Sequence, residues 1–151
     1  MAKIKYSREL DPEISSRAIG YELHVSPKHS YEICREIRRK NVSDAKRYLK
    51  EVIELKKAVP FKRYNMDIGH KKGSLGPGRY PQKAAREILK LIESAEANAE
   101  YKGLESEKMR IIHIATHRGR VIKGMIPRAF GRATANNTPT ATIEIILESW
   151  A

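Results

Sequence analysis

The feature that most limits what this chain can fold into is a stretch from Met109 to Ile143 without any aspartate or glutamate. The chain has 18 acidic residues, and an even distribution would place about four of them in a stretch of this length. Acidic side chains are disfavoured where a surface faces phosphate groups, because like charges repel and burial removes their hydration. The stretch is therefore predicted to contact a polyanion. Its cations are Arg110, Arg118, Arg120, Lys123, Arg128 and Arg132.

Large apolar residues and glycines lie between these cations. An apolar core strand would not accommodate so many arginines, and a disordered basic tail would not contain large apolar side chains. A long β-hairpin satisfies both conditions, because its backbone pairs with itself while its side chains face outward. We expect a partner to bury this hairpin, since a long loop without a partner is uncommon in a compact domain. The interleaved residues are Ile122, Met125, Ile126 and Phe130, with Gly119, Gly124 and Gly131.

The overall charge supports a nucleic-acid partner. The net charge is +12 and the isoelectric point is about 9.9, which is typical of domains that bind polyanions. RNA is favoured over DNA because folded RNA offers irregular pockets to such a hairpin, and no recognition helix or zinc finger is visible. A basic protein that uses its charge only for solubility remains an alternative. So does a free-standing nucleic-acid chaperone or architectural DNA-binding protein.

Chain length and cysteine content limit the number of domains and the cellular compartment that can be expected. The 151 residues fit a single domain, 1–151. A single cysteine, Cys34, excludes a disulfide framework and suits a reducing compartment. No apolar run is long enough for a membrane span, and no apolar signal core opens the sequence. We therefore expect a cytoplasmic protein without a membrane span.

Hydrophobic periodicity predicts an α+β fold: three helices packed on a small antiparallel sheet, with a long protruding β-hairpin. An extended N-terminal arm is expected over 1–17, a body over 18–108 and the extended hairpin over 109–148. Ser26 and Ser43 are predicted to cap the first two helices, and Gly103 to end the third. The third helix has the strongest apolar stripe, which includes Ile88, Leu89 and Ile92. The expected elements are a strand at 19–25, a helix from 27 to about 40, a helix that starts at the Ser43 cap and finishes before Pro60, a basic loop at 60–80, a helix that Pro81 opens and Gly103 ends, and strands at 109–121 and 140–147.

Several signals for other chemistry are weak. His113 and His117 share a strand face but have no Cys or acid nearby in sequence to complete a metal site. The glycine-rich segment 73–78 lacks the Gly-Lys-Ser/Thr of a phosphate-binding loop. Cys34 is interpreted as a small core residue. No arrangement of nucleophile, base and oxyanion donor is recognisable, so we expect no enzyme activity, no metal and no cofactor.

Four blocks of the sequence resemble a known family. They are 127–133 (PRAFGRA), continuing into 140–147; 43–49 (SDAKRYL); 59–65 (VPFKRYN); and 78–85 (GRYPQKAA), running on to 95–99. Together they resemble the twenty-second large-subunit ribosomal protein family, which is numbered seventeen in eukaryotes. The loop at 60–80 is similar to the archaeal and eukaryotic branch. The resemblance covers nearly the whole chain from Ile19 onward.

This resemblance implies a structural constituent of the large ribosomal subunit that binds large-subunit ribosomal RNA and supports assembly. The hairpin would reach through the RNA to the wall of the nascent-peptide exit tunnel, where Phe130 replaces an expected basic or imidazole side chain. The implied partners are large-subunit ribosomal RNA, neighbouring large-subunit ribosomal proteins and the nascent polypeptide. The expected tunnel-lining tip is Met125, Ile126, Pro127, Arg128, Ala129 and Phe130. The expected RNA-binding residues are Arg38, Arg39, Lys40, Lys62, Arg63, Lys71, Lys72, Arg79, Arg118, Arg120, Lys123, Arg128 and Arg132.

Overall fold

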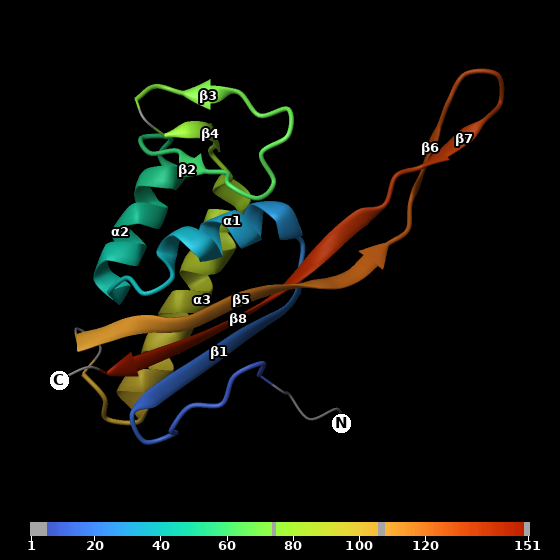
Figure 1. Ribbon diagram of the computed structural model, residues 1–151. Helices are drawn as coiled ribbons and strands as arrows, with labels where there is room; N and C mark the ends of the chain where they lie inside the picture. Colours follow the sequence, from blue (N-terminus) through green and yellow to red (C-terminus); the bar gives the residue numbers. More distant parts are fainter. Residues whose placement is uncertain (1–5, 74, 106–107, 150–151) are drawn as a thin grey trace.

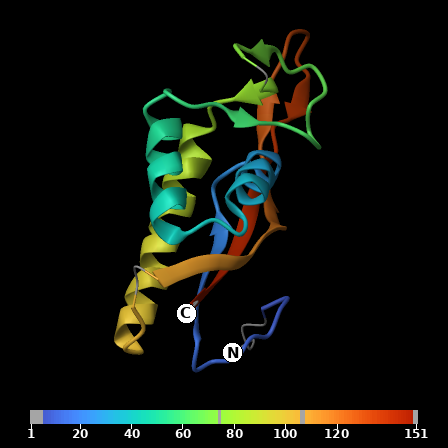
Figure 2. The same cartoon turned by 60° about the vertical axis from the view of Figure 1, so that its left-hand side comes forward.

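The computed structural model describes residues 6–73, 75–105 and 108–149. In this part of the chain, three helices cover one face of a three-stranded antiparallel sheet (Figures 1 and 2). The sheet order is β1 (Ser15–Leu23), β8 (Thr138–Ser149) and β5 (Met109–Ile122), so the last strand in sequence is the central one. This arrangement confirms the predicted α+β class.

The core lies between the sheet and the helices. Ile143, Ile145 and Leu147 occupy alternate positions of β8 and are fully buried in this core, as the alternating sequence of the strand predicts. From β5, Ile111 and Ile114 join them. The intervening residues of β8 face the opposite side of the sheet. There Ser7 of the N-terminal arm contacts Glu144 of β8 and His113 of β5.

Strand β1 exists as predicted, but it starts earlier and presents its other face to the core. Ala18 is in the core, and the buried Ser16 hydroxyl donates to the carbonyl of Ala95 on α3 at 2.9 Å. Tyr21 is exposed instead of half-buried. Small side chains face the helix because α3 packs directly on β1. A bulge at Glu22, where φ is +44°, then breaks the alternation on which the prediction relied.

Helix α1 (Pro27–Ile37) begins as expected, with Ser26 at the N-cap position and Pro27 in the first turn. It ends three residues before the predicted Lys40. The cause is Arg39, whose φ is +66° and whose N–H donates to the Ile111 carbonyl at 2.8 Å. The chain is thereby drawn onto the edge of β5.

Helix α2 (Val42–Ile53) begins one residue before the predicted cap. Asn41, not Ser43, is the N-cap residue. Asn41 forms a β-bridge with Arg110 that keeps its backbone extended. The helix can therefore start only at the next residue, Val42.

The segment 60–80 is more ordered than the predicted loop. Together with Val59 it forms β2 (Val59–Pro60), β3 (His70–Lys71) and β4 (Gly76–Arg79), a small sheet in the order β2-β4-β3. Gly78 is buried where β4 pairs with β2, and a Cβ atom there would lie 3.1 Å from the Val59 carbonyl oxygen. Such two- to four-residue strands are too short for an alternating pattern to reveal.

Helix α3 (Gln82–Tyr101) buries the predicted stripe with one correction. Ile88 and Ile92 are fully buried, as expected. Leu89 is only partly buried, and Leu91, which is 8% exposed, is the buried leucine of the helix instead. Leu91 follows Ile88 by three positions and so lies on the same face. Leu89 is one position from Ile88, at the edge of that face. Gly103 follows the helix with φ +76°, as its predicted role as helix terminator requires.

This correction predicts which leucine matters for stability. Leu91→Ala should lower the free energy of unfolding by about 2 kcal/mol, because it removes a nearly buried side chain. Leu89→Ala, the matched control, should cost about 1 kcal/mol or less. Urea denaturation of the two variants measures both values. Equal losses would place both leucines equally deep in the core.

Candidate nucleic-acid interface

The hairpin leaves the body of the protein at a β-bulge. Arg118 pairs with Ala141 but Val121 pairs with Pro139, so β5 has one extra residue there. The Thr140 hydroxyl donates to the Arg120 carbonyl at 2.6 Å within the bulge. A Cβ atom at Gly119 would collide with this hydroxyl, which explains the glycine. Bulges bend and twist strands, and Figure 1 shows the hairpin projecting from the body beyond this point.

Beyond the bulge the hairpin is thin and exposed on nearly all sides. Strand pairing continues to Ile122 opposite Thr138, and resumes between β6 (Met125–Pro127) and β7 (Ala133–Ala135). Between these two ladders the Asn136 N–H donates to the Gly124 carbonyl at 2.7 Å. The hairpin therefore satisfies its own backbone, while its side chains have no core to enter. This matches the extended arm that the sequence predicts.

The tip is a tight turn in an unusual conformation. Phe130 and Gly131 both have positive φ, +58° and +64°, and the Arg128 N–H donates to the Arg132 carbonyl at 2.7 Å. Gly131 adopts the left-handed angle that its sequence position suggests. Phe130 does so at a cost on the order of 1–2 kcal/mol for a residue with a Cβ atom. Phe130 is 93% exposed, so burial of its side chain does not offset this cost.

The cations of the hairpin are exposed along its length. Arg120 lies 3.5 Å from Glu22 of β1, and Arg128 Nε donates to the Thr134 hydroxyl at 3.3 Å. Lys123 and Arg132 are exposed near the tip. Among the described residues, no ion pair with an acid is present for Lys123, Arg128 or Arg132. These side chains are available to an external anion.

Two of the predicted RNA-binding residues belong to a second cluster at the end of α1. Arg38 and Arg39 line a cavity of about 490 Å³ together with Arg8 and Arg110. Arg38 is fixed there because its guanidinium donates to the Ile114 carbonyl at 3.0 Å. Lys40 does not join this cluster. It pairs with Glu36 at 3.1 Å and lies over the ring of Tyr48.

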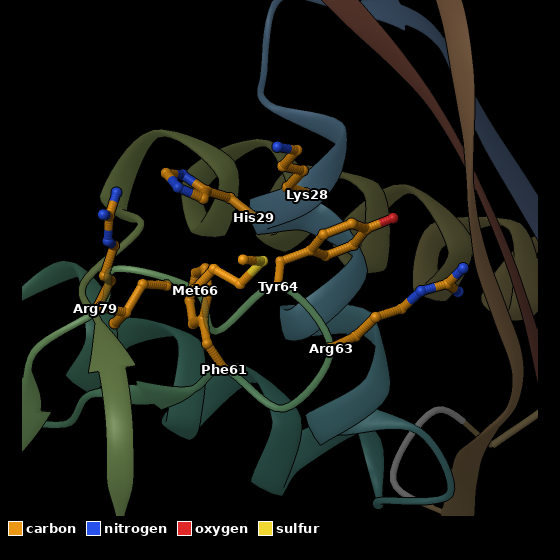
Figure 3. A pocket seen from close by; sticks show the side chains of 8 residues that line it. Lys28, His29, Phe61, Arg63, Tyr64, Met66 and Arg79 are labelled. Carbon is orange, nitrogen blue, oxygen red and sulfur yellow. The ribbon is translucent and has the colours of Figure 1, made fainter.

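The remaining predicted cations lie around the β2–β4 sheet. Arg63 and Arg79 line a pocket with Lys28 of α1 (Figure 3). Lys62 and Lys72 are exposed on the same segment, while Lys71 lies over the ring of Tyr80. The small sheet and the hairpin tip extend to the same end of the molecule in both views (Figures 1 and 2). Apart from Lys40, the predicted cations thus lie in three regions: the hairpin, the end of α1 and the surroundings of the β2–β4 sheet.

The sequence did not identify Arg8 and Lys28 as members of these clusters, and it identified Arg110 only as a cation of the acid-free stretch. Lys28 also lines the groove at the base of the hairpin with Arg118 and Gly119, so it connects the pocket near β4 to the hairpin. The sequence could have indicated this position, because Lys28 directly follows Ser26-Pro27 and therefore lies in the first turn of a helix. Arg8 gave no such signal, because its place depends on how the N-terminal arm crosses the sheet.

The two histidines of β5 contact a buried carboxylate. Glu144 of β8 is only 1% exposed. Its Oε1 lies 2.9 Å from His113 Nε2 and 3.1 Å from His117 Nε2, and it accepts hydrogen bonds from the Ser7 backbone N–H and hydroxyl. Burial alone would raise the pKa of Glu144, but these hydrogen bonds lower it from 4.5 to about 2. In the described part of the chain, no group of three or more His, Cys, Asp or Glu side chains has metal-binding geometry.

Cys34 is a core residue, as predicted. It is buried, its Sγ lies 3.1 Å from the Thr116 hydroxyl, and burial raises the pKa of its thiol to about 12. A thiol with so high a pKa remains protonated at neutral pH and is a poor nucleophile.

Comparisons with known proteins agree with one another. The model of the family described as ribosomal protein L22p/L17e matches residues 18–148. The large ribosomal subunit protein uL22 of Methanocella arvoryzae is 54% identical over 149 residues, which cover 97% of each chain. That of Methanopyrus kandleri is 54% identical over 144 residues, covering 93% of this chain and 90% of the relative. None of the helices among the described residues has the length and apolar character that a membrane crossing needs.

Proposed function

Because the chain belongs to the ribosomal protein L22p/L17e family of the large ribosomal subunit, we propose that it anchors this subunit's RNA through its basic hairpin. The family is a structural class of ribosomal protein, and its members are partners of ribosomal RNA and of other ribosomal proteins. The chain would act as a single domain, with an N-terminal arm at 1–17, a body at 18–108 and the hairpin at 109–148. A free-standing nucleic-acid chaperone is the less favoured interpretation.

The observation that carries this proposal is the exposed, acid-free hairpin. Among the described residues, Lys123, Arg128 and Arg132 have no acidic partner, and the guanidinium groups of the hairpin are suited to grip phosphates or to stack on bases. A protein of this size would not maintain such a surface in water without a partner to cover it. The clusters around Arg38 and around Arg79 would extend the contact onto the body, whereas Lys40 is held by its own ion pair and would contribute less.

The tip of the hairpin is proposed to line the nascent-peptide exit tunnel. Met125 and Phe130 are among the most exposed apolar side chains of the described residues. Met125 begins β6 and Phe130 lies between β6 and β7, and Figure 1 shows these two strands far from the helices. The backbone of Phe130 is held in the left-handed region, with φ +58°. Residues held in strained conformations cluster at functional positions. Met125, Ile126, Pro127, Arg128, Ala129 and Phe130 would therefore meet the tunnel lumen and the nascent polypeptide.

Shortening the hairpin tests this placement. Residues 125–135 are replaced by an Asn-Gly turn that joins Gly124 to Asn136, which are already hydrogen-bonded. The melting temperature of the free protein should change by less than about 2 °C, since the removed residues have no contact with the core. The shortened protein should still join large subunits but alter stalling on an arrest peptide.

Point variants give a matched control. Phe130→Ala should alter stalling, whereas Tyr101→Ala, an equally exposed aromatic at the end of α3, should not (exposures of 93% and 94%). If the shortened protein joins subunits and stalling is unaffected, the tip does not line the tunnel. If the shortened protein unfolds, the tip belongs to the folded core.

A further inference from the structure

A pocket between the first turn of α1 and the segment after β2 combines aromatic rings with cations. Phe61 and Tyr64 line it from the segment after β2, and His29 and Lys28 line it from the helix (Figure 3). Arg79 closes one side. The cavity measures about 230 Å³, which suits one flat ring system better than a large ligand.

The walls of this pocket are fixed before any ligand arrives. The carboxylate of Glu32 is 1% exposed and accepts the backbone N–H groups of Lys62, Arg63 and Tyr64 at 3.2, 2.8 and 2.8 Å. This buried acid therefore sets the path of the segment that carries Tyr64. Phe61 packs edge-on against His29, with ring centroids 5.4 Å apart. A preorganised site loses less entropy when a ligand binds.

The electrostatic character of the pocket favours an anionic ligand with a flat face. Lys28 Nζ and the Arg63 guanidinium lie 5.8 and 5.5 Å from the centroid of the Tyr64 ring. None of the residues that line the pocket is acidic. Burial, together with the charge of Arg79, lowers the pKa of His29, so its ring is neutral at neutral pH and free to stack.

Met66 also lines the pocket, on its exposed side. Its side chain is 86% exposed, and in Figure 3 its thioether lies in view between the rings of His29 and Tyr64. Methionine is flexible and packs well against aromatic faces. It can move aside and then pack against a ring that enters.

We propose that this pocket receives one unpaired nucleobase of the large-subunit RNA, extruded from its stack. The base stacks against Tyr64 and His29 under Met66, and Lys28 and Arg79 hold the adjoining phosphate. Stacking of unpaired bases on aromatic rings is the usual basis of RNA recognition by proteins. Because Lys28 also lines the groove beside Arg118, the same strand can continue onto the hairpin. The inference rests on the proposed RNA-binding function and adds a specific nucleotide contact to it.

The first test is chemical probing of base accessibility across the RNA of large subunits that contain each variant. In Tyr64→Ala subunits, one unpaired base should become about tenfold more reactive, since an aromatic stacking partner is lost. Tyr64→Phe should restore protection, and Tyr101→Ala should have no effect. If Tyr64→Ala assembles normally and no base changes, the inference fails while the proposed function stands.

A second test does not depend on how the Tyr64 variants fold. Met66 is replaced by a benzophenone amino acid, and assembled subunits are irradiated. A crosslink to a single nucleotide of the large-subunit RNA supports the inference. A crosslink to a ribosomal protein, or no crosslink, overturns it and assigns the pocket another occupant. If even the wild-type protein fails to join large subunits, the proposed function itself is wrong.

Discussion

Raising the salt concentration from 50 to 200 mM should weaken binding of this protein to large-subunit ribosomal RNA by roughly a thousandfold. The reason is the exposed, acid-free hairpin, whose cations replace the counterions around phosphates. Each neutralised phosphate releases counterions, so the logarithm of affinity falls linearly with the logarithm of salt concentration. We expect a slope of magnitude about five or more. A filter-binding titration at several salt concentrations measures it.

Single charge removals make this test specific. Arg128→Gln should reduce the magnitude of the slope by about one, because Arg128 projects from the exposed tip. Arg47→Gln is the control: Arg47 is equally charged, but it lies on α2 and pairs with Asp44 at 2.7 Å. Its removal should leave the slope unchanged. A slope near zero for the wild-type protein would contradict the electrostatic basis of the proposed function.

Removal of the Glu144 carboxylate should be the most damaging single change on the outer face of the sheet. Glu144→Ala should lower the free energy of unfolding by about 3 kcal/mol, since charge-assisted hydrogen bonds to Ser7, His113 and His117 are lost together. Glu148→Ala is the matched control on the same strand and face. Glu148 lies 3.9 Å from Arg110 in a more exposed pair, so its loss should cost about 1 kcal/mol or less.

The contribution of Glu144 should also depend on pH in a defined direction. The pKa of its carboxyl group is lowered in the folded protein, from 4.5 to about 2. Its stabilising effect is therefore fully present above pH 4.5 and is lost as the pH falls toward 2. The difference in unfolding free energy between wild type and Glu144→Ala should therefore shrink as the pH falls from 4.5 toward 2. A difference that stays constant down to pH 3 would show that the hydrogen bonds do not depend on the charge.

The sequence predicted the long elements well because each has a strong local signal. The stripe of α3 and the alternation of β8 identified both elements, and Gly103 marked the end of the helix. Errors arose where tertiary contacts override local preference. Arg39 ends α1 because β5 binds its backbone, and Asn41 starts α2 for the same reason. Neither contact has a local sequence signature.

The candidate interface was predictable in part. The absence of acids between Met109 and Ile143 identified the hairpin directly, because charge patterns need no knowledge of the fold. The Glu144 network was missed because Ser7 lies 137 residues away in sequence. Glu32 was missed for a similar reason: its three backbone partners come from a segment that looks like a plain basic loop. Buried carboxylates of this kind become recognisable only once distant segments are placed together.

The position of β8 has a consequence for how the protein is made. Its partner β1 is completed at Leu23, but β8 begins only at Thr138, so most of the chain is synthesised before the central strand exists. Until then β1 and β5 have no common neighbour, and the apolar face of α3 lacks its sheet. Contacts this distant in sequence slow folding, because a long loop must close before they form. The return strand of the hairpin is also the strand that completes the body, so closing the hairpin and completing the core are one late, cooperative event.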